Sequence, residues 1–78
     1  MNILELLEMN RDRIVYAYQP DGKGRPGKVV YLFADGKASL LDAAPEDAGG
    51  RYAFKACKRV EECVQKNNLP IKLIQAWS

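Results

Sequence analysis

The sequence predicts a small α+β domain in which one long helix packs on an antiparallel sheet. In residues 28–41, two apolar runs are joined by Asp35-Gly36, and these residue types best tolerate the positive φ angles of a tight hairpin turn. Residues 51–67 instead repeat their apolar side chains at helical spacing. A chain of 78 residues has room for one domain, 1–78, around a single core.

A short helix is expected first, over residues 3–10. Asn2 is a typical N-cap residue, and Glu5 stands three positions after it, as in a capping box. A helix of this length is not stable alone, so we expect it to dock on the sheet. Its apolar side would consist of Ile3, Leu4, Leu6 and Leu7.

Three strands are expected next, as an antiparallel meander. The first covers residues 11–19, which hold a run of aromatic, β-branched and small side chains. The second, 29–34, is apolar at every position, which indicates a strand in mid-sheet or one covered on both faces. The third covers 37–41, after the Asp35-Gly36 turn. A loop at 20–27, rich in glycine and proline, joins the first two strands.

The main helix is expected over residues 51–67, across the sheet. Asn67 is a typical left-handed stop, and Pro70 prevents continuation of the helix. In the connection before it, residues 45–47 are expected to form a single helical turn, with proline at its first position. The apolar stripe of the helix spans about 120° of arc and consists of Ala53, Ala56, Cys57, Val60, Cys63 and Val64.

A fourth strand is expected over residues 69–77, completing the sheet after the helix. It can join either edge of the meander. Parallel pairing with the strand at 37–41 or with the strand at 11–19 would make the sheet mixed. The indole of Trp77 is expected to hold the C-terminus against the domain.

The types of residue present in the chain argue against an enzyme. The chain contains no histidine and no threonine, and its only serines are Ser39 and Ser78, so acyl-transfer triads lack a base. The adjacent acidic pairs of the chain diverge instead of converging on a substrate. No glycine pattern follows a strand and opens a helix, as a phosphate-binding loop requires. We therefore expect neither catalysis nor a cofactor.

The two cysteines are expected to be reduced core residues. Cys57 and Cys63 lie six positions apart on the main helix, so their side chains diverge and cannot form a disulfide. Without histidine they do not form a metal cluster, and no metal is expected. No run reaches the ~18 apolar residues of a membrane span, and Glu5 interrupts the start of the chain. These features predict a cytoplasmic protein without membrane contact.

The net charge is only +2, but the placement of the basic residues predicts an anion site as one alternative. Cations crowd the first half of the main helix, directly after Gly49-Gly50, where free backbone N–H groups favour an anion. A second basic patch lies in the loop at 23–28. Together they would bind nucleic acid or another polyanion, unless they form a solvated face. The residues concerned are Lys23, Arg25, Lys28, Arg51, Lys55, Lys58 and Arg59.

The predicted order helix–strand–strand–strand–helix resembles that of the double-stranded RNA-binding domain. In that family the basic start of the second helix contacts phosphates. The resemblance is topological, and it implies that the start of the helix at 51–67 would contact an RNA backbone.

Phe54 lies off the apolar stripe of the main helix. It therefore either packs on the first helix or marks a contact surface. If the first helix leaves the second face of the sheet uncovered, that face needs a partner, and a homodimer follows. The leading prediction is thus a small non-enzymatic protein-interaction or structural module, with polyanion binding as the alternative.

Overall fold

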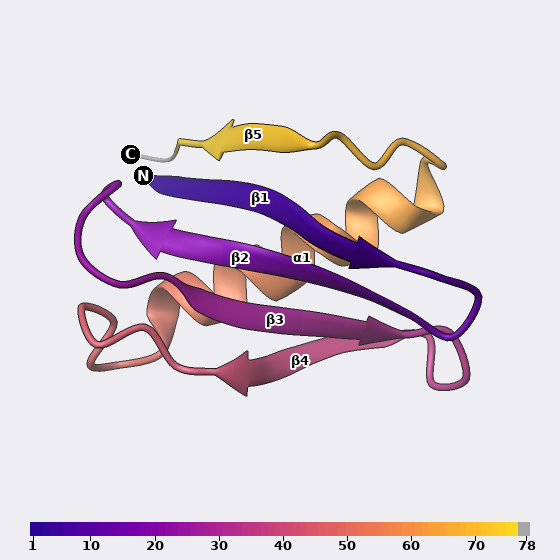
Figure 1. Ribbon diagram of the computed structural model, residues 1–78, viewed down its shortest axis with the longest axis horizontal. Coiled ribbons are helices and arrows are strands. Elements are labelled where there is room, and N and C mark those ends of the chain that lie inside the picture. The colour runs from indigo at the N-terminus through magenta and orange to yellow at the C-terminus, as the bar shows by residue number, and fades with distance from the viewer. Residues whose placement is uncertain (77–78) are drawn as a thin grey trace.

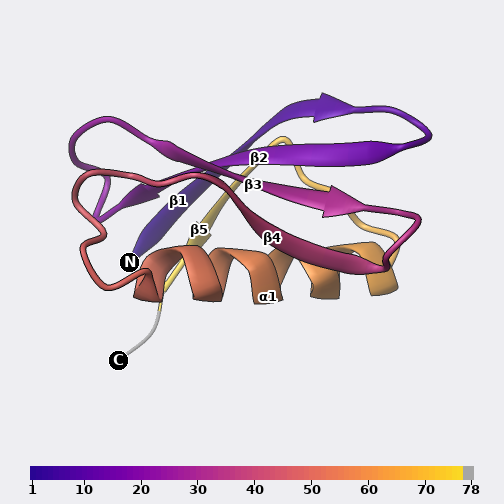
Figure 2. The same ribbon diagram turned by 90° about the horizontal axis from the view of Figure 1, so that it is seen from below.

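A computed structural model describes residues 1–76 of the protein. It shows a five-stranded antiparallel sheet with one helix across a single face (Figures 1 and 2), so the predicted α+β class is confirmed. Four strands precede the helix, instead of the predicted helix and three strands. The order across the sheet is β4-β3-β2-β1-β5. The elements are β1 (Asn2–Met9), β2 (Arg13–Pro20), β3 (Gly27–Leu32), β4 (Lys37–Asp42), α1 (Arg51–Gln65) and β5 (Lys72–Gln75).

The prediction of an N-terminal helix over residues 3–10 is wrong, because this segment is strand β1. Leucine and glutamate favour helices locally, but burial in the sheet overrides that preference. Leu4 is fully buried between Tyr18 of β2 and Leu73 of β5, while the neighbouring Glu5 is exposed. A bulge at Leu7 breaks this alternation. The order of elements seen in the double-stranded RNA-binding domain is therefore absent.

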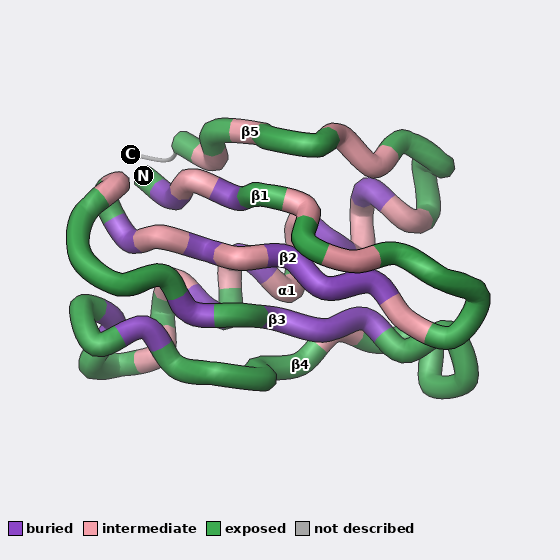
Figure 3. Tube along the Cα trace, in the orientation of Figure 1, coloured by how far each residue is buried: buried purple, intermediate pink, exposed green. Residues whose placement is uncertain are grey.

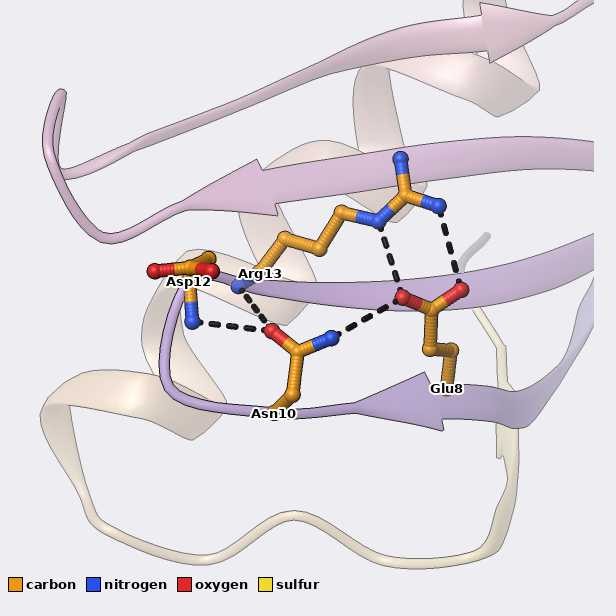
Figure 4. A network of polar contacts seen from close by, with 4 residues as sticks. All are labelled: Glu8, Asn10, Asp12 and Arg13. Carbon is orange, nitrogen blue, oxygen red and sulfur yellow. Dashed lines mark hydrogen bonds and ion pairs between the residues drawn. The ribbon is translucent and has the colours of Figure 1, made fainter.

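A polar network closes the turn between β1 and β2 (Figure 4). The side-chain oxygen of Asn10 accepts hydrogen bonds from the backbone N–H groups of Asp12 (2.8 Å) and Arg13 (3.0 Å). The Arg13 guanidinium donates twice to Glu8, and this hydrogen bonding lowers the pKa of the Glu8 carboxyl. Asn10 thus starts a turn between strands, where the sequence favoured the end of a helix.

The hairpin between β3 and β4 is present, but its turn differs from the prediction. Residues 33–36 all lie outside the strands, and the carbonyl of Leu32 accepts from the N–H groups of both Asp35 (3.1 Å) and Gly36 (2.9 Å). Gly36 has a φ of 67°, whereas a two-residue type I′ turn also needs a positive φ at Asp35. The second strand accordingly ends at Leu32 and not at 34.

The C-terminal strand β5 pairs with β1, a strand that the sequence did not predict. β5 runs antiparallel to β1, with Ile74 opposite Ile3, so the predicted mixed sheet is wrong. Residues 3–10, which were predicted as a helix, belong largely to β1 and provide the strand with which β5 pairs. The strand is also shorter than the predicted 69–77, and the Tyr16 hydroxyl holds the chain before it by donating to the Pro70 carbonyl at 2.5 Å. The expectation for Trp77 lies outside the described residues.

Helix α1 confirms the prediction for its start and its buried stripe. It begins at Arg51, ends at Gln65 rather than 67, and is followed by Asn67 with a φ of 53°. Residues 45–47 form no helical turn. Instead, the N–H of Asp47 donates to the Ala44 carbonyl and closes a simple turn. Both cysteines are free; Cys63 is buried and Cys57 is half-buried. The core beneath the helix consists of Leu4, Ile14, Tyr16, Tyr18, Val29, Tyr31, Ala44, Ala53, Ala56 and Val60.

Candidate functional site: the open face of the sheet

The face of the sheet that α1 does not cover is the main candidate site, and we call it the open face. Figure 2 shows the helix on one side of the sheet only. Side chains alternate between the two faces of a strand, so the neighbours of core residues point to the open face. Its apolar members are Ile3, Leu7, Val15, Ala17, Val30, Leu32 and Ile74.

The centre of the open face is apolar and tightly surrounded. Val15 is 4% exposed and Val30 is 7% exposed, although no other element of the described chain lies over them. Figure 3 shows that buried residues of both faces of the sheet are concentrated along β2 and β3. Around Val15 and Val30, Leu7 is 49% exposed and Leu32 is 37% exposed. A contiguous patch of this kind is typical of a protein contact surface.

Sequence reasoning considered an uncovered second face only as an alternative, because it placed a helix at 3–10. Leu7 and Ile3 were assigned to the apolar side of that helix, and the helix was expected to dock on the sheet. A usable signal existed in the period-two spacing of Leu4 and Leu6 around the exposed Glu5. The bulge at Leu7 ends that spacing after a few residues.

Phe54 lies beside a second hollow, a groove of about 340 Å³ between α1 and β4. Its ring is 64% exposed, and the Lys58 ammonium lies 5.5 Å from the ring centre. With no N-terminal helix to pack on, Phe54 borders this groove opposite Leu40. The Glu61 carboxylate accepts from the Ala38 N–H at 2.8 Å and thereby covers one donor of the edge strand β4.

The predicted basic residues are divided between two sides of the molecule. The loop at 20–27 and the start of α1 do lie at the same end of the sheet (Figure 1). Lys28, however, stands on the open face, opposite the face that α1 covers. Arg25 pairs with Asp42 at 3.2 Å, and Arg59 pairs with Glu62. The remaining members of the predicted set are exposed or half-buried and comprise Lys23, Arg51, Lys55 and Lys58.

The N-terminus of α1 already holds an anion from its own chain. Asp47, only 8% exposed, accepts hydrogen bonds from the backbone N–H groups of Tyr52 (3.1 Å) and Ala53 (2.9 Å). Nearby, Asp21 accepts from the Tyr52 hydroxyl and from the N-terminal ammonium, which lowers the pKa of the Asp21 carboxyl. The Asp47 carboxylate thus occupies the position where an external phosphate would find backbone N–H donors.

Removing the Asp47 carboxylate should destabilise the protein. We expect Asp47→Ala to lower the free energy of unfolding by about 1–2 kcal/mol, because two buried N–H groups at the helix start lose their acceptor. Urea denaturation followed by circular dichroism measures this change. The neighbouring exposed Glu46→Ala is the control and should stay within about 0.5 kcal/mol of the wild type. Equal effects of the two substitutions would contradict the capping role.

The described residues offer little reactive chemistry. Burial raises the pKa of the Cys57 thiol to about 11, which suppresses the nucleophilic thiolate at neutral pH. Residues 1–76 contain no group of three or more Asp, Glu, Cys or His side chains placed to hold a metal ion.

Two further findings bear on identity. Within the described part of the chain, no helix has the length and apolarity needed to cross a bilayer. No family model, no curated protein and no solved structure matches this chain.

Proposed function

We propose that this protein is a small non-enzymatic interaction module that docks onto another protein chain through its open face. One observation carries the proposal: Val15 and Val30 form an apolar centre bordered by half-exposed leucines, on a face without a covering layer. Sheets ordinarily bury such a face against a second layer. A partner would supply that layer.

The energy available from this contact is substantial for a domain of this size. Covering a half-exposed leucine contributes about 1 kcal/mol, and Leu7 and Leu32 border the same centre. Charged residues lie at both ends of the face: the Glu8–Arg13 ion pair stands beside Val15 and Leu32, and Glu5 and Lys28 border a hollow of about 370 Å³. An apolar centre with a charged border is the usual composition of a protein interface.

Polyanion binding is the weaker proposal. Arg51 and Lys58 on the outer side of α1 could still contact a polyanion. The backbone N–H groups at the helix start, however, already donate to Asp47. Arg25 and Arg59 are engaged by carboxylates of the same chain. We also propose a cytoplasmic location, which is supported by the two free cysteines.

A photo-crosslinking experiment tests the docking proposal. A benzoylphenylalanine residue replaces Ser39, which stands opposite Val30 on the open face. In a second protein it replaces Lys66, at the end of α1 on the other side of the sheet. We expect a specific adduct in native cells from position 39 and none from position 66, because only the open face docks.

Two leucines provide a matched control for that adduct. Leu32 stands opposite Arg13 on the open face and is 37% exposed, whereas Leu40 stands opposite Val29 on the helix side and is 47% exposed. Leu32→Lys should abolish the adduct from position 39, while Leu40→Lys should preserve it. The absence of an adduct at position 39, or its survival in Leu32→Lys, would overturn the docking proposal.

A further inference from the structure

A row of charged residues crosses the open face in register. Glu5 of β1 stands opposite Ala17 of β2, and Ala17 stands opposite Lys28 of β3. The row continues outward to Lys72 of β5, beside Glu5, and to Asp42 of β4, beside Lys28. Read across the sheet, the signs are positive, negative, neutral, positive and negative. Each charged residue on one side of Ala17 therefore has a residue of opposite charge at the corresponding position on the other side.

The neutral member of this row lies on the central strand. In the order β4-β3-β2-β1-β5, two strands flank β2 on each side. A two-fold axis parallel to β2 and above Ala17 would place β1 of one copy over β3 of the other, at the same height along the strands. Glu5 would then face Lys28 of the second copy, and Lys72 would face Asp42. Every charged member of the row would meet an opposite charge.

The apolar centre obeys the same symmetry. Val15 also lies on β2, so it would meet Val15 of the second copy, while Glu8, the β1 residue opposite Val15, would approach Val30. Two sheets packed face to face lie about 10 Å apart with their strands near −30°, so the pairs closest to β2 align best. The whole molecule extends 30 × 20 Å in the view of Figure 1, so the open face lies within that outline, against the roughly 800 Å² that each partner buries in a standard interface.

We propose that the partner of the open face is a second copy of this chain, packed face to face about a two-fold axis parallel to β2. This inference rests on the proposed function and specifies its partner. The evidence is the self-complementary charge row together with the apolar centre on the symmetry axis. Asp42 also pairs with Arg25 of its own chain, so the Glu5–Lys28 contacts carry the specificity.

Charge reversal of this pair gives a sharp test by sedimentation velocity. In Glu5→Lys, lysine would face Lys28 of the second copy at both symmetric contacts. In Lys28→Glu, two carboxylates would face each other at both contacts. Each variant alone should dissociate with a Kd raised about a hundredfold over the wild type. Mixed in equal amounts, the two variants should form a heterodimer, because both contacts then pair opposite charges.

Controls separate this result from loss of folding. Lys66→Glu makes the same charge change away from the open face and should dimerise like the wild type. Raising salt should strengthen the dimer of Glu5→Lys, since screening relieves repulsion but does not restore an unfolded chain. Mixing that fails to restore the dimer, or a wild type that stays monomeric, overturns the inference. An adduct from position 39 with a different protein would overturn it while leaving the docking proposal intact.

Discussion

Replacing Gly27 with alanine is expected to lower the free energy of unfolding by about 3 kcal/mol. A Cβ atom at Gly27 would lie 2.5 Å from the Asp42 carbonyl oxygen and 2.6 Å from the Ala44 amide nitrogen. It would also lie 2.5 Å from the Tyr18 ring. Two of these neighbours are backbone atoms, so relief requires the chain after β4 to move. That movement would break the hydrogen bond from the Ala44 N–H to the Tyr18 hydroxyl.

Gly49 is the matched control for this substitution. No heavy atom lies within 4 Å of a Cβ built there, and its φ is outside the positive range. Gly49→Ala should change stability by less than about 0.5 kcal/mol, or raise it slightly by restricting the unfolded chain. Urea denaturation of both variants measures the difference. Equal stabilities would show that the backbone around Gly27 is looser than these distances indicate.

Gly27 also illustrates what the sequence could not reveal. In the sequence it is one more glycine of the loop at 20–27, and its neighbours suggest only mobility. In the structure it is the first residue of β3 and stands opposite Tyr18, where the chain after β4 packs closely. Nothing local to the loop encodes this approach, because Asp42 and Ala44 arrive from a distant part of the chain.

The elements with strong local signals were predictable. The stripe of α1 and the hairpin around Gly36 follow from periodicity and turn residues over short windows. Strand β1 was not predictable in this way, since its leucines and glutamates favour a helix and its alternation stops at Leu7. The wrong assignment of residues 3–10 as a helix also made the predicted strand order wrong, because β5 pairs with β1 and with no other strand.

The candidate site depended on the same segment. Hydrophobic spacing correctly indicated that Val29 to Leu32 belong to a sheet, but whether a face is covered depends on elements remote in sequence. For the basic residues, the sequence predicted more free charge than the structure contains. Arg25 and Arg59 are visible in the sequence, yet their acidic partners are identified only by the fold. Charge placement along a chain therefore overstates the free positive charge at its surface.

The second large effect should appear at alkaline pH, through Tyr16. Burial raises the pKa of the Tyr16 hydroxyl from 10 to about 12, and this side chain is 1% exposed. The folded state therefore holds the phenolic proton more tightly than the unfolded state does. The associated stability is complete below pH 10 and is lost as the pH rises from 10 through 12. The loss from this group should reach about 2 kcal/mol.

Tyr16→Phe isolates this contribution, because Cys57 and the other tyrosines titrate in both proteins. At neutral pH the variant should be less stable by about 1 kcal/mol, since the Pro70 carbonyl loses the hydroxyl that donates to it. Between pH 10 and 12 the wild type should lose stability faster, so that the two curves converge and then cross. Urea denaturation of both proteins at stepped pH gives the curves. Parallel curves across this range would mean that the Tyr16 hydroxyl reaches solvent in the folded protein.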